Sequence, residues 1–131
     1  MKFEKFYTSD KEGKSNCIIR TFCKLFNKEY SEVVNELLEI ARQLNYESYA
    51  EIEVFEKYLN NHEYSVLQTN SEIQIKNLQL PLGKYAVFCY DKKDFYHMLS
   101  IEDNIIYDKD DTCLELYVIT IYKENNKIKT Y

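Results

Sequence analysis

The chain has 131 residues, a length that fits one domain able to bury a genuine core. Hydrophobic residues make up 45% of it and charged residues 30%, which is the ordinary composition of a soluble globular protein. The net charge of −5 creates no basic field of the kind that phosphate backbones require, so nucleic acid is not an expected partner.

The sequence also argues against a membrane or secreted protein. No stretch is long and apolar enough for a membrane span, and charges interrupt the apolar residues at the N-terminus, unlike those of a signal peptide. We therefore expect a cytoplasmic protein with no membrane partner, in which all cysteines are free thiols. None has the C-x-x-C spacing, and a zinc site built from the cysteines together with His97 has no support in the sequence. We predict no metal site and no cofactor.

The first half of the chain has helical periodicity. Residues 1–14 are predicted to form an N-terminal arm that docks on the core through aromatic side chains and ends in polar turn residues. Ser15 or Asn16 is expected to cap the first helix. Apolar residues three and four apart predict helices at about residues 16–26, 31–44 and 48–59.

The second half changes to the alternating pattern of strands. We expect residues 69–82 to be irregular or to contain a helical turn. The predicted strands cover about residues 64–67, 84–90, 95–101, 105–107 and 114–122. N-terminal helices followed by a small antiparallel sheet make the predicted fold class α+β, within a single domain that covers residues 1–131.

Cys17 is the cysteine that lies where a nucleophile would be activated. It falls in the first turn of a predicted helix, whose backbone dipoles favour the thiolate. Cys23 lies nearly two turns deeper and is expected to fill the core. Cys89 lies within a predicted strand, and Cys113 lies in the loop before the last strand.

The two histidines differ in their surroundings. His62 follows two asparagines in a polar turn and is expected to be a solvated surface residue. His97 shares a strand face with Phe95, Leu99 and Ile101, and we expect this face to meet the helices. The position alone leaves two interpretations open: a core histidine satisfied by one hydrogen bond, or a catalytic base.

Asp108 becomes a partner for His97 under one condition. If Asp103–Asn104 is a two-residue type I′ turn, Leu99 faces Asp108 across the hairpin. Asp108 then lies on the same face as His97, one diagonal step away. A three-residue loop would move Asp108 to the other face, where it would be only a polar residue at the end of a strand.

A cysteine at a helix start, a histidine on a strand and an aspartate at the end of the next strand match the papain-like plan. The segment Asn16–Thr21 resembles the D/N-C-x-x-R-A signature of small bacterial and phage papain-like cysteine peptidase-fold proteins, with Thr21 in place of alanine. Further phrases of that family resemble three other segments of this chain: Tyr30–Val33 (Y-x-x-V), Gly83–Phe88 (GKYIVF) and Ile101–Asp108 (I-x-D/N-G-x-x-Y-D). In the last of these, Asn104 replaces the turn glycine. The resemblance covers about residues 15–123.

This resemblance implies a papain-like fold and a set of roles. Cys17 would attack a carbonyl group, His97 would hold the thiolate as an ion pair and later protonate the leaving group, and Asp108 would orient His97. The implied activity is that of a cysteine peptidase or amidase that forms an acyl-thioester with a peptide or protein substrate.

The oxyanion hole is where the sequence departs from papain-like enzymes. Those enzymes use the backbone N–H of the nucleophile and a side-chain donor, usually an upstream glutamine. No glutamine precedes Cys17 in this sequence. Asn16 is the candidate donor, although capping the helix would occupy the same side chain, and Lys11 and Ser15 are other candidates. The alternative function is therefore an inactive papain-fold binding or inhibitory module, for example a phage protein that acts on a host factor.

Overall fold

The structure is a computed structural model, and it describes residues 1–8 and 16–125. Most of the predicted polar turn before the first helix, including Lys11, lies outside these residues, and so does the candidate cap Ser15. The fold is α+β, as predicted from the sequence. Three α-helices occur in the described residues: α1 (Cys17–Phe26), α2 (Tyr30–Gln43) and α3 (Ile52–Asn61).

The described strands form one six-stranded sheet in the order β1-β5-β4-β3-β6-β2. Their bounds are β1 Lys2–Lys5, β2 Tyr64–Thr69, β3 Lys84–Tyr90, β4 Tyr96–Glu102, β5 Ile105–Asp108 and β6 Tyr117–Glu124. The predicted antiparallel sheet is wrong in one respect, because β1 runs parallel to β5. This strand was missed because its four residues have no alternating pattern, and it forms by pairing with the edge that β5 offers.

Several element boundaries also differ from the prediction. Helix α3 begins at Ile52, four residues later than the sequence indicates. The last strand begins at Tyr117, because a short helix, η2 (Asp111–Glu115), precedes it. The side chain of Asp110 caps η2 by accepting a hydrogen bond of 3.0 Å from the backbone N–H of Thr112. A second short helix, η1 (Ile75–Asn77), lies in the segment predicted to be irregular or to contain a helical turn.

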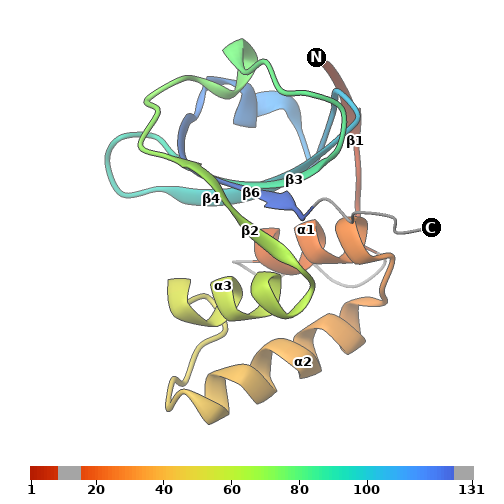
Figure 1. Ribbon diagram of the computed structural model, residues 1–131, viewed down its shortest axis with the longest axis vertical. Coiled ribbons are helices and arrows are strands. Elements are labelled where there is room, and N and C mark those ends of the chain that lie inside the picture. Colours follow the sequence, from red (N-terminus) through yellow and green to blue (C-terminus); the bar gives the residue numbers. More distant parts are fainter. Residues whose placement is uncertain (9–15, 126–131) are drawn as a thin grey trace, which may run out of the picture.

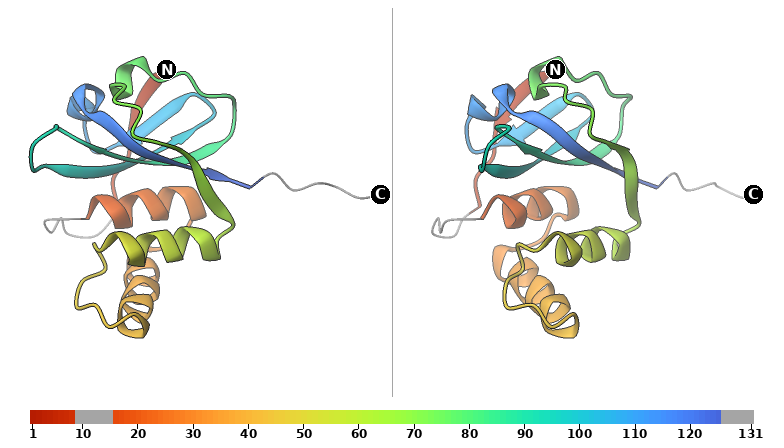
Figure 2. Two further views of the ribbon diagram at one scale, coloured as in Figure 1. Left: turned by 60° about the vertical axis from the view of Figure 1, so that its left-hand side comes forward. Right: turned by 90° about the vertical axis from the view of Figure 1, so that its left-hand side faces the viewer.

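The helices lie together on one side of the sheet, with α1 next to it (Figures 1 and 2). Ala86 of β3 and Met98 of β4 belong to the core that the helices share with the sheet. The opposite face is covered by the chain around η1 and η2, where Ile75 and Cys113 pack on the sheet. Within residues 1–8 and 16–125, no helix is both long and apolar enough to cross a membrane.

The face of β4 that meets the helices was predicted wrongly. Leu99 and Ile101, which share a face with His97, pack in the core beside η1 and η2, whereas Met98 packs against the helices. The reason is that both faces of β4 are buried from Met98 to Ile101, so buried residues follow one another and apolar residues do not alternate with exposed polar ones. Such a strand does not show in its sequence which face meets which layer.

The hairpin between β4 and β5 has the register that the sequence predicted. Ser100 pairs with Tyr107, so the connection is the two-residue turn Asp103–Asn104. Both turn residues have positive φ, 47° for Asp103 and 68° for Asn104, as a type I′ turn requires. The same register brings Leu99 opposite Asp108 and leaves Asp108 on the face of His97.

This turn allows a direct test. Replacing Asn104 with valine is expected to lower the free energy of unfolding by about 1–2 kcal/mol, because a β-branched side chain at positive φ meets its own backbone. Replacement with glycine, which adopts positive φ freely, is the control and should not destabilise the protein. Urea denaturation measures both, and equal stabilities for the two variants would contradict the type I′ geometry.

Candidate active site

Cys17 is the first residue of α1 and is half-buried. Its thiol is hydrogen-bonded to the side chain of His97 and to the backbone of Met98. The hydroxyl of Thr21 donates a hydrogen bond of 2.7 Å to the carbonyl oxygen of Cys17, one turn back along the helix. Cys17 is therefore held at the N-terminal end of α1 with its sulfur directed toward β4.

Asp108 holds the other side of the His97 ring. The distance from His97 Nε2 to Asp108 Oδ2 is 2.6 Å. Because Nε2 is engaged by Asp108, Nδ1 is the ring nitrogen that remains for the Cys17 thiol. The structure thus brings the three predicted catalytic residues, Cys17, His97 and Asp108, into one hydrogen-bonded series.

The arrangement favours a thiolate–imidazolium pair. Burial by itself raises the pKa of the Cys17 thiol, but the hydrogen bond and the charge of His97 outweigh it and hold this pKa below its ordinary value. Burial would lower the pKa of His97, but Asp108 and then Cys17 raise it from 6.5 to about 9. The two shifts together favour the form in which the imidazole carries the proton and the sulfur is ionised.

Asp108 is equipped to remain an anion. Burial would raise its pKa, but the hydrogen bond and charge of His97 lower it, helped by the backbone of Lys109 and by Arg20. Its Oδ1 accepts hydrogen bonds from the backbone N–H of Lys109 at 2.8 Å and from Arg20 at 3.1 Å. Only 3% of its side chain is exposed, so protein groups rather than solvent supply most of the hydrogen bonds that the carboxylate accepts.

Strand β5 is shorter than β4, and α1 approaches β4 at the part that β5 does not reach. Strand β5 pairs with Ser100–Glu102 of β4, and His97 lies closer to the start of β4, outside that stretch. The N-terminal end of α1 lies beside this part of β4, where Met98 contacts the sulfur. His97 can therefore meet Cys17 although its neighbours Leu99 and Ile101 face the core beside η1 and η2.

Arg20 connects the nucleophile helix to the rest of the site. It lies one turn after Cys17, and its guanidinium donates to Asp108 Oδ1 at 3.1 Å and to Asn16 Oδ1 at 2.7 Å. Only 6% of its side chain is exposed. The sequence alone does not identify Asp108 as the partner of Arg20, because the two residues are distant along the chain.

Asn16 does not act as the predicted side-chain cap. It occupies the N-cap position of α1, but its side chain makes no capping hydrogen bond, since its carboxamide oxygen accepts from Arg20 instead. The amide nitrogen is the atom that would donate to an oxyanion. Asn16 lines the same cleft as Cys17, so its predicted oxyanion role stays a prediction. Lys11 and Ser15, the other candidate donors, lie outside the described residues.

A cleft of about 790 Å³ opens beside Cys17. Cys17 and His97 line it together with residues from the start of α3 and from the ends of β3 and β4 that flank their hairpin turn. Phe95 lies next to the ring of His97, with the two ring centroids 5.8 Å apart and the ring planes nearly parallel. The sequence did not single out this cleft, although the aromatic pair Phe95 and Tyr96 immediately before His97 was a usable signal.

The other thiols and the second histidine belong elsewhere. Burial raises the pKa of Cys89 and of Cys113, and Cys23 is buried in the core below the helices, as predicted. His62 was predicted to be a solvated surface residue, and this is wrong. Its ring stacks on Phe26 with the ring centroids 4.2 Å apart, which places His62 at the opposite end of α1 from Cys17.

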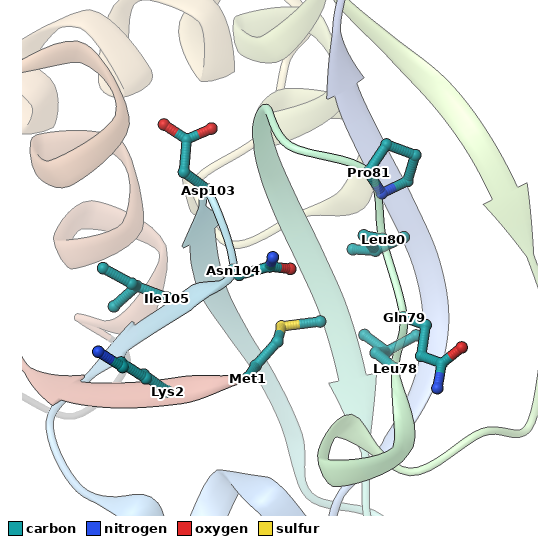
Figure 3. A pocket seen from close by; sticks show the side chains of 9 residues that line it. All are labelled: Met1, Lys2, Leu78, Gln79, Leu80, Pro81, Asp103, Asn104 and Ile105. Carbon is teal, nitrogen blue, oxygen red and sulfur yellow. The ribbon is translucent and has the colours of Figure 1, made fainter.

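A second cavity, of about 830 Å³, lies away from these residues (Figure 3). It is bordered by the first residues of the chain, the Asp103–Asn104 turn and the segment 78–81 before β3. None of the candidate catalytic residues lines it. Among residues 1–8 and 16–125, no group of histidine, cysteine, aspartate and glutamate side chains is arranged to hold a metal ion.

The chemistry available at the site follows from its own residues. An ionised sulfur, a protonated imidazole and a fixed carboxylate form the set needed for attack on a carbonyl carbon and for protonation of a leaving group. No family model, curated protein or solved structure matches the chain.

Proposed function

We propose that this protein is a cysteine hydrolase of the papain-like type, which acts on an amide, peptide or ester bond. The observation that carries the proposal is the hydrogen-bonded series from Cys17 through His97 to Asp108. The order of these residues along the chain and their places on a helix start, a strand and the end of the next strand support a papain-like fold.

In the first step the Cys17 thiolate attacks the carbonyl carbon of the substrate and forms a carbon–sulfur bond. The backbone N–H of Cys17 is one of the groups at a helix start without an intrahelical partner, and it donates to the oxyanion together with the amide of Asn16. When the bond to the leaving group breaks, the His97 imidazolium protonates the departing nitrogen or oxygen. An acyl-thioester and a neutral imidazole remain.

In the second step the neutral imidazole of His97 removes a proton from water or from an acceptor amine. The resulting nucleophile attacks the thioester carbonyl, and the carbon–sulfur bond breaks. The carboxylic acid or amide product leaves, and the thiolate–imidazolium pair is restored. Asp108 stays ionised throughout and stabilises the imidazolium by its hydrogen bond to Nε2.

The ion pair predicts selective alkylation of Cys17 in mild acid. At about pH 6 an ordinary thiol with a pKa of about 8.5 is less than about 1% ionised, whereas the hydrogen bond and charge of His97 lower the pKa of Cys17 and favour its thiolate. We expect iodoacetamide to modify Cys17 about tenfold faster or more in the wild type than in His97→Ala. Mass spectrometry of the intact protein and its peptides measures the rate and the site.

His62→Ala is the matched control, because His62 lies at the other end of α1 and should leave the labelling of Cys17 unchanged. Equal labelling of Cys17 in the wild type and in His97→Ala would contradict the proposal. That outcome would favour a binding or inhibitory module built on the same fold.

A further inference from the structure

The segment that follows Asp108 in the chain folds back onto its carboxylate. The backbone N–H of Lys109 donates to Asp108 Oδ1 at 2.8 Å. The next residue, Asp110, caps the short helix η2. This helix carries Cys113, which is 2% exposed and whose thiol is hydrogen-bonded to the side chain of Asp108. The function proposed above gives no role to this buried thiol.

A small cavity of about 180 Å³ lies where these groups meet. Cys113 lines it together with Arg20, His97 and Asp108. The four residues come from four different elements, which are η2, α1, β4 and β5. Cys113 does not line the cleft beside Cys17. It therefore belongs to the surroundings of the carboxylate that orients the imidazole and not to the cleft in which a substrate would bind.

The Cys113 thiol is suited to be a lasting hydrogen-bond donor. An ionised carboxylate only accepts hydrogen bonds, so the S–H group donates to Asp108. The sulfur also lies 3.5 Å from the carbonyl oxygen of Asp110, which is a second acceptor. Burial raises the pKa of the Cys113 thiol, and the charge of Asp108 and the hydrogen bond to it raise this pKa further. The thiol therefore retains the proton that makes it a donor.

The two oxygens of Asp108 have different tasks. Oδ2 lies 2.6 Å from His97 Nε2, whereas Oδ1 accepts hydrogen bonds from Lys109 and Arg20. A carboxylate keeps one orientation only when surrounding donors and packing hold it there. We propose that Cys113 is a positioning residue, whose thiol helps to hold the Asp108 carboxylate in the orientation that meets the imidazole of His97. This inference rests on the proposed function.

Loss of this donor is expected to weaken the pair of His97 and Asp108. Without the thiol, the carboxylate rotates more freely and water enters the enlarged cavity, so the carboxylate stabilises the imidazolium less. The pKa of His97, which is about 9 in the wild type, then falls, and the pKa of Cys17 rises. The charged groups that line the same cavity stay unchanged in the variants: Arg20, Lys109 and Asp110.

Two substitutions of similar volume separate the hydrogen bond from the packing. Cys113→Ala removes the donor, whereas Cys113→Ser keeps a hydroxyl group that donates to Asp108. The NMR titration of the His97 ring and the pH profile of Cys17 alkylation are measured for both. We expect the midpoint of the His97 titration to fall by about half a pH unit in Cys113→Ala, which is the size of one weak hydrogen bond to a charged group. It should stay near the wild-type value in Cys113→Ser.

Two further variants complete the test. Cys113→Val also lacks the donor but fills the space of the thiol, so it should shift the titration downward even if Cys113→Ala does not fold. Cys23→Ala is the matched control, because Cys23 is a buried thiol in the core that the helices share with the sheet. It should lower the free energy of unfolding while leaving the titration of His97 and the alkylation profile of Cys17 unchanged.

The results distinguish a failure of this inference from a failure of the proposed function. A His97 midpoint that is unchanged in Cys113→Ala and Cys113→Val, or that falls equally in Cys113→Ala and Cys113→Ser, would overturn the inference alone. A wild-type protein in which Cys17 is alkylated like an ordinary thiol at every pH would overturn the proposed function and the inference together.

Discussion

Replacing Arg20 with methionine is expected to lower the free energy of unfolding by about 3–5 kcal/mol. The guanidinium is 6% exposed and bonded to Asp108 and Asn16, so its removal leaves a buried carboxylate with less compensation and a buried amide oxygen without this donor. Since domains are stable by only about 5–15 kcal/mol, this is a large fraction of the total. Urea denaturation followed by circular dichroism measures it.

Arg42→Met is the matched control. Arg42 also pairs with a carboxylate, Glu39, but its side chain is 73% exposed, and an exposed pair contributes about 1 kcal/mol or less. The double variant Arg20→Met, Asp108→Asn should lose less stability than the sum of the single variants, because the two side chains share one interaction. Strict additivity, or similar losses for Arg20 and Arg42, would contradict a buried pair.

Arg20 also has a positioning role that stability alone does not report. By holding Asp108, it fixes the carboxylate that binds His97. Arg20→Lys keeps the charge but loses the geometry of the guanidinium, which reaches Asp108 and Asn16 at once. We expect this variant to stay folded and to shift the pH profile of Cys17 alkylation toward that of an ordinary thiol.

Replacing Asp108 with asparagine is expected to reduce hydrolysis by roughly 10³–10⁴-fold, as loss of the orienting aspartate does in enzymes with a triad. A neutral amide does not compensate the positive charge of the imidazolium. The pKa of His97 therefore falls from about 9 toward its ordinary value, and the pKa of Cys17 rises. In the wild type the pair persists as pH rises until His97 loses its proton near pH 9. In the variant it should be lost at lower pH.

The pH profile of Cys17 alkylation, with the NMR titration of the His97 ring, measures this change. Asp111→Asn is the control, because Asp111 is an exposed carboxylate on η2, close to Asp108 in the chain. It should leave both profiles unchanged. An Asp108→Asn variant with wild-type profiles would show that Asp108 neither orients the imidazole nor raises its pKa.

Local patterns in the sequence were sufficient for the parts of the site that depend on neighbouring residues. The start of α1 at Cys17 follows from the apolar spacing after it, and the Asp103–Asn104 turn follows from residues that tolerate positive φ. A turn of known length then determines the hairpin register, so the shared face of His97 and Asp108 was predictable. Both features depend on residues close together in the sequence, so they can be predicted without knowledge of the tertiary structure.

The face of β4 that meets the helices was not predictable in this way. The residues from Met98 to Ile101 are all buried, because both faces of the strand are covered, so they show no alternation of buried and exposed positions. Strand β1 was missed for a related reason: it exists because β5 offers it an edge, and its own residues carry no pattern. Both features depend on which distant segments pack together.

By itself, then, the sequence determined the α+β class and three candidates, with a nucleophile at a helix start, a histidine on a strand and an aspartate at the next strand end. Only the tertiary structure decided that these side chains meet, that Arg20 joins α1 to Asp108, and that a cleft opens beside Cys17. The physical reason is that hydrogen bonds and burial act between surfaces close in space. Asn16 and Asp108 are bonded to one guanidinium although most of the chain separates them.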